Sequence, residues 1–126
     1  MTDKMLFCFD VDGTLTNQKM IGDKFTYAGI IPTHVLVYLI SYGHRVAIVS
    51  PSPYFPEGFE SMVYAKNGSN DYRWENIENA MVANNILDKN SVVYVDDLKA
   101  NRDKIKTWGV REVYSPEEFM VDYIQW

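Results

Sequence analysis

The first strand-like segment of the chain ends in two acids and a glycine. Residues 6–9 (Leu-Phe-Cys-Phe) are apolar and lead directly into Asp10, Asp12 and Gly13. Side chains two positions apart on a strand share one face, so the two carboxylates are expected to lie together. Gly13 allows a turn with an unusual φ that presents backbone amides to an anion. Two acids beside an anion-binding turn would repel a phosphate without a cation between them, so the stretch predicts a Mg²⁺ site.

The rest of the chain alternates apolar strands with helices. Buried strands are expected at 4–10, 46–49 and 92–95, with a short strand at 112–114. Helices are expected at 32–42, 74–85 and 99–108 and from Pro116 onward, with a short one near 57–64. Such alternation is typical of an α/β fold, and we expect a three-layer, Rossmann-like arrangement around a mainly parallel sheet.

Two segments lack a regular pattern. Residues 17–31 mix polar residues and glycines without a helical or strand period, which predicts a long loop. Residues 51–56 contain three prolines, which lack an N–H group and restrict φ, so neither a helix nor a strand is expected there.

Polar residues follow three of the predicted strands. Asp10 and Asp12 follow the first, Ser50 follows the second, and Asp96 and Asp97 follow the third. Ligands of open α/β sheets bind at the carboxyl ends of the strands, where these residues would meet. The topology therefore predicts one site at this edge of the sheet.

The stretch D-V-D-G-T-L-T at 10–16 resembles the first motif of the haloacid-dehalogenase-like hydrolases. Ser50 is similar to the second motif of this family, and the acidic pair 96–97 to its fourth. The third motif is a Lys or Arg, for which we favour Arg73, with Lys66 as the alternative. The resemblance extends over nearly the whole chain and implies that Ser50 and Arg73 hold the phosphoryl oxygens.

The resemblance also implies roles for the acids. Asp10 would attack phosphorus to form an aspartyl-phosphate, and Asp12 would act first as general acid and then as general base. Mg²⁺ would bind the Asp10 side chain, the Asp12 backbone carbonyl and Asp97, with Asp96 in support. The expected activity is hydrolysis of phosphate monoesters.

Three residues depart from the pattern of the family, and one of them is Arg73, because the third motif is more usually Lys. Pro51 follows Ser50 and lacks the amide that commonly helps to hold the phosphate at that position. Asn101 stands where an acidic residue often follows the fourth motif. A second hypothesis therefore stays open, a catalytically weak or inactive protein that binds a metal or a phosphate. A phospho-accepting signalling receiver fits less well, because receivers lack the Gly-Thr-Leu-Thr that follows the acids here.

The length of the chain restricts the size of the site. At 126 residues we expect one domain, 1–126, and the gaps between the motifs are too short for the cap domain that many relatives carry. An open site would admit bulky phosphorylated substrates, either small molecules or the ends of macromolecules. The phosphatase domain of polynucleotide kinase-phosphatases has a similar first motif and acidic pair, which makes nucleic-acid 3′-phosphate ends one hypothesis.

Charge and hydropathy restrict the partners and the location. The net charge of −5 argues against a broad nucleic-acid-binding surface, so nucleic acid is expected only as a substrate. No apolar run approaches the ~20 residues of a membrane span. The first strand begins too early for a signal peptide, and the single cysteine, Cys8, fits a reducing compartment. We therefore expect a cytoplasmic protein without a membrane partner.

Overall fold

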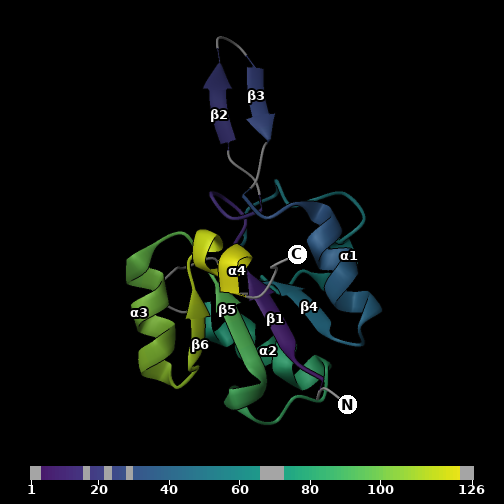
Figure 1. The fold of residues 1–126 in the computed structure, drawn as a ribbon, viewed down its shortest axis with the longest axis vertical. Coiled ribbons are helices and arrows are strands. Elements are labelled where there is room, and N and C mark those ends of the chain that lie inside the picture. The colour runs from purple at the N-terminus through teal and green to yellow at the C-terminus, as the bar shows by residue number, and fades with distance from the viewer. Residues whose placement is uncertain (1–3, 16–17, 22–23, 28–29, 66–72, 123–126) are drawn as a thin grey trace.

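The computed structural model describes residues 4–15, 18–21, 24–27, 30–65 and 73–122. Its main sheet is parallel, with the strand order β4–β1–β5–β6 (Figure 1). These strands are β1 (Leu6–Phe9), β4 (Arg45–Ile48), β5 (Val92–Val95) and β6 (Glu112–Tyr114). The helices are α1 (Thr33–Ser41), α2 (Arg73–Ala83), α3 (Lys99–Trp108) and α4 (Pro116–Asp122), with 3₁₀ turns η1 (Glu60–Met62) and η3 (Lys89–Ser91). The predicted α/β class and parallel sheet are confirmed.

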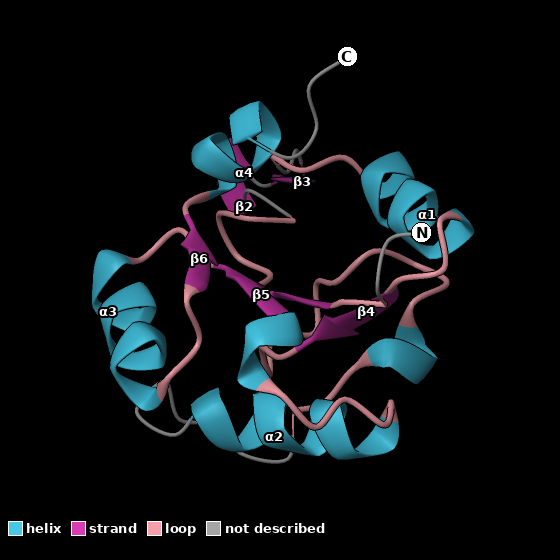
Figure 2. Cartoon of the chain, turned by 60° about the horizontal axis from the view of Figure 1, so that its bottom comes forward, coloured by secondary structure: helices cyan, strands magenta, loops and turns pink. Residues whose placement is uncertain are grey.

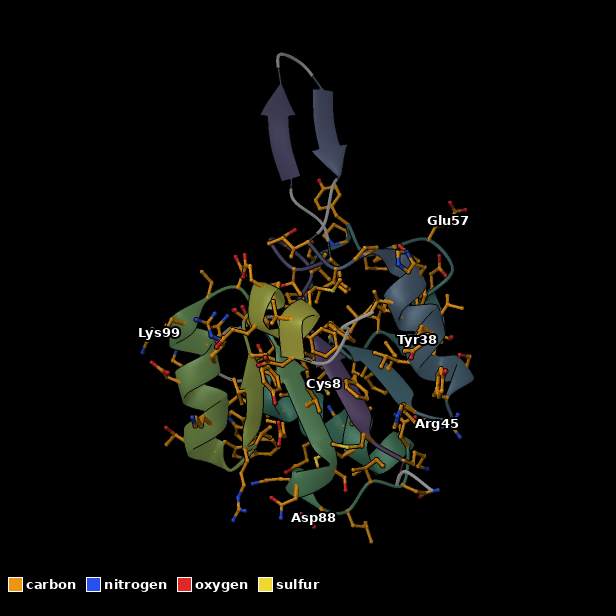
Figure 3. The ribbon with its side chains drawn as sticks, in the orientation of Figure 1. Cys8, Tyr38, Arg45, Glu57, Asp88 and Lys99 are labelled. Carbon is orange, nitrogen blue, oxygen red and sulfur yellow. The ribbon has the colours of Figure 1, made fainter. Side chains whose placement is uncertain are left out.

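Helices cover both faces of this sheet (Figure 2). Phe7 and Phe9 of β1 pack in one core with residues of α1 and α4. Leu6 and Cys8, which point the other way, pack in a second core with residues of α2 and α3. A strand buried on both faces is apolar at every position, which is why residues 6–9 show no alternation. Cys8 is wholly buried near the centre of the molecule, and this burial raises the pKa of its thiol (Figure 3).

The last helix begins at a capping box. The Ser115 N–H donates to Glu118 Oε1 at 2.9 Å, and the Glu118 N–H donates to Ser115 Oγ at 3.2 Å. These two bonds satisfy amides that the first turn of a helix leaves without partners. The predicted start of α4 is therefore confirmed.

Within 17–31, where a long loop was predicted, the described residues 18–21 and 24–27 form strands. Strands β2 (Gln18–Ile21) and β3 (Lys24–Tyr27) pair antiparallel as a separate hairpin. The hairpin projects from the end of the molecule where β1 terminates (Figure 1). The prediction was wrong because backbone pairing alone can define a ribbon outside the main sheet, without the apolar alternation that marks a core strand.

The carboxyl ends of β4, β1 and β5 lie beside one another. The strand ladder continues past their last residues, since the Asp10 N–H donates to the Val95 carbonyl and the Val49 N–H donates to the Phe9 carbonyl, both at 3.0 Å. The Asp96 N–H likewise donates to the Tyr114 carbonyl at 3.1 Å. The acids after β1 and β5 are thus held in register by the sheet itself. Within the described residues, no helix has the length and hydropathy that crossing a membrane requires.

Candidate functional site

A cleft of about 460 Å³ opens at the edge of the main sheet where β1, β4 and β5 end. Its walls include all but one of the predicted site residues, namely Asp10, Asp12, Ser50, Arg73 and Asp97. The remaining walls come from residues 51–54 and from Leu98 and Asn101. Asp96, the other predicted residue, is wholly buried next to the cleft, and Lys66 lies outside the described residues. The predicted convergence of three strand ends is confirmed.

Three of the acids form a compact cluster. Asp10, Asp96 and Asp97 each offer a carboxylate oxygen, and these atoms all lie within 4.8 Å of one another. Asp10 and Asp96 are buried, whereas Asp97 is exposed. Hard oxygen donors from adjacent strand ends are the ligands that Mg²⁺ takes, so the residues fit this ion. The Asp12 side chain is exposed and is not part of the cluster, and its predicted contact through the backbone carbonyl stays a prediction.

Arg73 partly balances the charge of the cluster. It is the first residue of α2, and its Nη1 lies 3.0 Å from Asp10 Oδ1 and 3.8 Å from Asp96 Oδ2. One turn further along α2, Asn76 Nδ2 donates to the Val49 carbonyl at 3.1 Å. This bond fastens α2 to the segment that leads into Ser50. The helix therefore brings a cation to the acids and holds the end of β4 beside them.

The surroundings of the acids change their protonation. Burial raises the pKa of Asp10 to about 7, the charge of Asp96 acts in the same direction, and Arg73 opposes both. Burial also raises the pKa of Asp97, which lies in hydrogen-bonding contact with Asp10. Without a cation, the cluster therefore retains a proton near neutral pH.

We expect the affinity for Mg²⁺ to rise with pH up to about 7, where the pKa of Asp10 lies. A cation requires the ionised carboxylate, so each pH unit below this pKa should weaken binding by up to ~10-fold. Calorimetric titration with Mg²⁺ between acid and mildly alkaline pH measures this. Asp10→Asn serves as the control and should show a shallower dependence. An affinity that does not change with pH would contradict the raised pKa.

Asp96 is held by several protein donors. The Leu98 N–H donates to Asp96 Oδ1 at 2.9 Å, and Asn101 Nδ2 donates to Oδ2 at 3.1 Å. The Tyr94 hydroxyl also donates to Oδ2, and Arg102 Nη1 donates to the Asp96 carbonyl at 2.9 Å. These bonds orient Asp96 within the turn after β5, whereas Asp97 is the more accessible of the pair. Sequence reasoning missed Tyr94, although its place two residues before Asp96 puts both on one strand face.

Ser52 is a further site residue that sequence reasoning missed. Its hydroxyl donates to Asp12 Oδ1 at 3.1 Å, and its N–H donates to Ser50 Oγ at 3.2 Å. The Tyr54 N–H approaches Ser52 Oγ at 3.4 Å. The serine next to Pro51 therefore connects the turn after β1 with the turn after β4. No sequence signal marked this contact, because it joins residues 40 positions apart through two irregular loops.

Gly13 packs directly against the acidic cluster. Its φ is +79°, and a Cβ at this position would lie 2.7 Å from the carboxylate carbon of Asp97. The next residue, Thr14, is buried, and its hydroxyl lies 3.4 Å from Asp10 Oδ2. The predicted turn at Gly13 is confirmed, and the structure adds a steric reason for the glycine.

Gly13→Ala should weaken Mg²⁺ binding by about 10-fold or more, because the new methyl group displaces the Asp97 carboxylate from the cluster. Gly43→Ala is the matched control. Gly43 has a similar φ of +88°, but nothing lies within 4 Å of a Cβ there. Both variants should lose about 1–2 kcal/mol of folding stability, since L-residues disfavour this conformation. Equal Mg²⁺ affinity in the two variants, by calorimetric titration, would refute the steric argument.

Known proteins provide no further guide to this site. Comparison of the chain with family models, with curated proteins and with solved structures finds no match.

Proposed function

We propose that the protein is a Mg²⁺-dependent phosphohydrolase of the haloacid-dehalogenase-like type. The observation that carries this proposal is the convergence of Asp10, Asp96, Asp97 and Arg73 beside an open cleft. A cation site, a buried carboxylate nucleophile and a guanidinium for phosphoryl oxygens are the components that phosphoryl transfer requires. The order of the motifs along the chain supports the same proposal.

The residues of this chain would act in two steps. Asp10 attacks phosphorus, and a bond from its carboxylate oxygen to phosphorus forms as the bond to the leaving oxygen breaks. Asp12 donates a proton to that oxygen and then accepts one from the water that hydrolyses the aspartyl-phosphate. Ser50 and Arg73 bind the phosphoryl oxygens as charge redistributes. When bound by Asp10 and Asp97, Mg²⁺ would supply neutralisation of the phosphate charge.

The elements at the carboxyl ends of the strands support the proposal of an open site without a cap domain. The segment between the first and second motifs contains the β2–β3 hairpin, α1 and β4. Apart from the β2–β3 hairpin, the described part of the chain has no helices or strands over the carboxyl ends of the main sheet (Figure 1). An open site suits phosphorylated small molecules and the ends of macromolecules, including nucleic-acid 3′-phosphate ends.

Release of inorganic phosphate, with and without Mg²⁺, tests the proposal. The panel comprises an aryl phosphate, nucleotides, sugar phosphates, phosphopeptides and 3′-phosphorylated DNA. We expect release that requires Mg²⁺ and that chelation abolishes. Release that is insensitive to Mg²⁺, or absent from the whole panel, would refute the hydrolase.

A second candidate is a catalytically weak or inactive protein that binds a metal or a phosphate. Pro51 lacks an N–H group, and the N–H of Ser52 already donates to Ser50 Oγ at 3.2 Å. The turn after β4 therefore presents fewer amide donors to a phosphate than its length would allow. Loss of one such donor costs ~10²–10³-fold in rate, which is the reason to consider this candidate. Binding of Mg²⁺ without release of phosphate from any ester would favour it.

A further inference from the structure

A second cleft adjoins the candidate site. It has a volume of about 390 Å³ and shares Pro53 and Tyr54 with the first cleft as a common wall. Its other lining residues are Leu15, Thr33, Phe55, Pro56 and Glu57. The proposed reaction assigns no role to this second cleft. Because the two clefts share this wall, a substrate held at Asp10 that extends past Tyr54 would reach the second cleft.

The contact between Ser52 and Asp12 indicates which part of a substrate would lie there. The leaving oxygen lies opposite Asp10 and beside the acid that protonates it, which in the proposed reaction is Asp12. Because Ser52 Oγ lies 3.1 Å from Asp12 Oδ1, the leaving group emerges next to the segment 52–54. Tyr54, which is 38% exposed, comes next along this segment and faces both clefts.

The lining of the second cleft restricts the chemistry of the leaving group. Tyr54, Pro53 and Pro56 provide the apolar part of this lining, beside Thr33 and Glu57, and a ring can stack on the face of Tyr54. Phe55 also lines the cleft, but its side chain packs against the core. Glu57 is the one charged residue among the described residues that line it, and it lies at the end of the molecule from which the hairpin projects (Figure 3). A carboxylate repels additional phosphates, so this lining disfavours a polyanion.

We propose that the second cleft binds the leaving group of the substrate and selects an uncharged, ring-bearing alcohol or phenol. This inference rests on the proposed function, because Asp12 is assigned there as the acid that protonates the leaving group. It narrows the substrate class to monophosphate esters of ring-bearing compounds, in preference to nucleic-acid ends.

Binding of two phosphonates that resist hydrolysis tests the inference without turnover. Benzylphosphonate and methylphosphonate differ in the ring, and calorimetric titration measures the affinity of each. We expect benzylphosphonate to bind more tightly and Tyr54→Ala to weaken it by roughly 3–10-fold, with little change for methylphosphonate. Tyr54→Phe should retain the affinity, because the ring remains. Tyr42→Ala removes an exposed tyrosine outside both clefts and is the matched control.

Turnover of matched esters provides the second measurement. Benzyl phosphate and ethyl phosphate are both esters of primary alcohols, and kcat/KM should favour benzyl phosphate in the wild type but not in Tyr54→Ala. A 3′-phosphorylated oligonucleotide should be a poorer substrate than benzyl phosphate. Equal affinities of the two phosphonates, an equal effect of Tyr54→Ala on both, or a preference for the oligonucleotide would each overturn the inference. Tyr54-dependent binding of benzylphosphonate without phosphate release from any ester would support the cleft and refute the hydrolase.

Discussion

Asp10→Asn is expected to reduce Mg²⁺-dependent phosphate release by at least ~10³-fold. The amide is nearly the same size as the carboxylate but is neither a nucleophile nor a charged ligand, and loss of a nucleophile removes most of an enzyme's rate. Asp10 is also 6% exposed and lies 3.0 Å from Arg73 Nη1, so the change is made in the buried part of the cluster. A phosphate-release assay at saturating Mg²⁺ measures the effect.

Asp12→Asn separates the two roles proposed for these acids. Without a general acid, release should fall by ~10²–10⁴-fold for esters with poor leaving groups and by less for an aryl phosphate. With the aryl phosphate, whose leaving group needs no proton, the aspartyl-phosphate on Asp10 should accumulate because its hydrolysis lacks the general base. Radiolabelled phosphate on the protein would reveal it. If Asp10→Asn still releases phosphate at the wild-type rate, another residue is the nucleophile.

Arg73→Met is expected to lower the free energy of unfolding by about 3–5 kcal/mol in the absence of Mg²⁺. The Arg73 side chain is 4% exposed and forms ion pairs with Asp10 and Asp96. Its removal leaves buried carboxylates without this compensating charge, and the desolvation of an unpaired buried charge is the main cost. Urea unfolding at mildly alkaline pH, above the pKa of Asp10, measures the change.

Two further variants test whether charge causes this loss. Arg45→Met removes an exposed arginine at the amino end of β4, away from the cluster, and should change stability by no more than about 0.5 kcal/mol (Figure 3). The double variant Arg73→Met with Asp10→Asn should be more stable than Arg73→Met alone, because one buried negative charge is gone. A double variant that is no more stable would indicate that Arg73 contributes mainly by packing.

Much of the fold could be predicted because the segments that build the core carry local signals. The predicted range 99–108 agrees with α3, and the predicted range 112–114 agrees with β6. Gly109, with a φ of +128°, ends α3 as a glycine in this conformation commonly does. Ile105 of α3 is buried, and Val113 and Tyr114 of β6 are partly buried against the two cores. The apolar residues therefore recur with the period of a helix or a strand.

The hairpin and the short turns were harder to predict for the same physical reason. Strands β2 and β3 lie outside the main sheet, and pairing of their backbones leaves no period in the sequence. Near residues 57–64, where a short helix was expected, the structure contains the 3₁₀ turn η1. Segments that contribute little to the core are restrained by their neighbours more than by their own residues.

Local patterns of residues were sufficient to indicate the principal residues of the candidate site. Asp10, Ser50 and the acidic pair 96–97 each follow a buried strand, and parallel strands necessarily bring such ends to one edge of the sheet. The hydrogen bonds that connect these residues became visible only in the folded chain. The loops after β1 and β4 form the hydrogen bond from Ser52 to Asp12, and Tyr54 lines the second cleft. Both features depend on how these irregular loops pack against the sheet. Loop conformation follows from long-range packing and hydrogen bonding, which no local pattern of residues encodes.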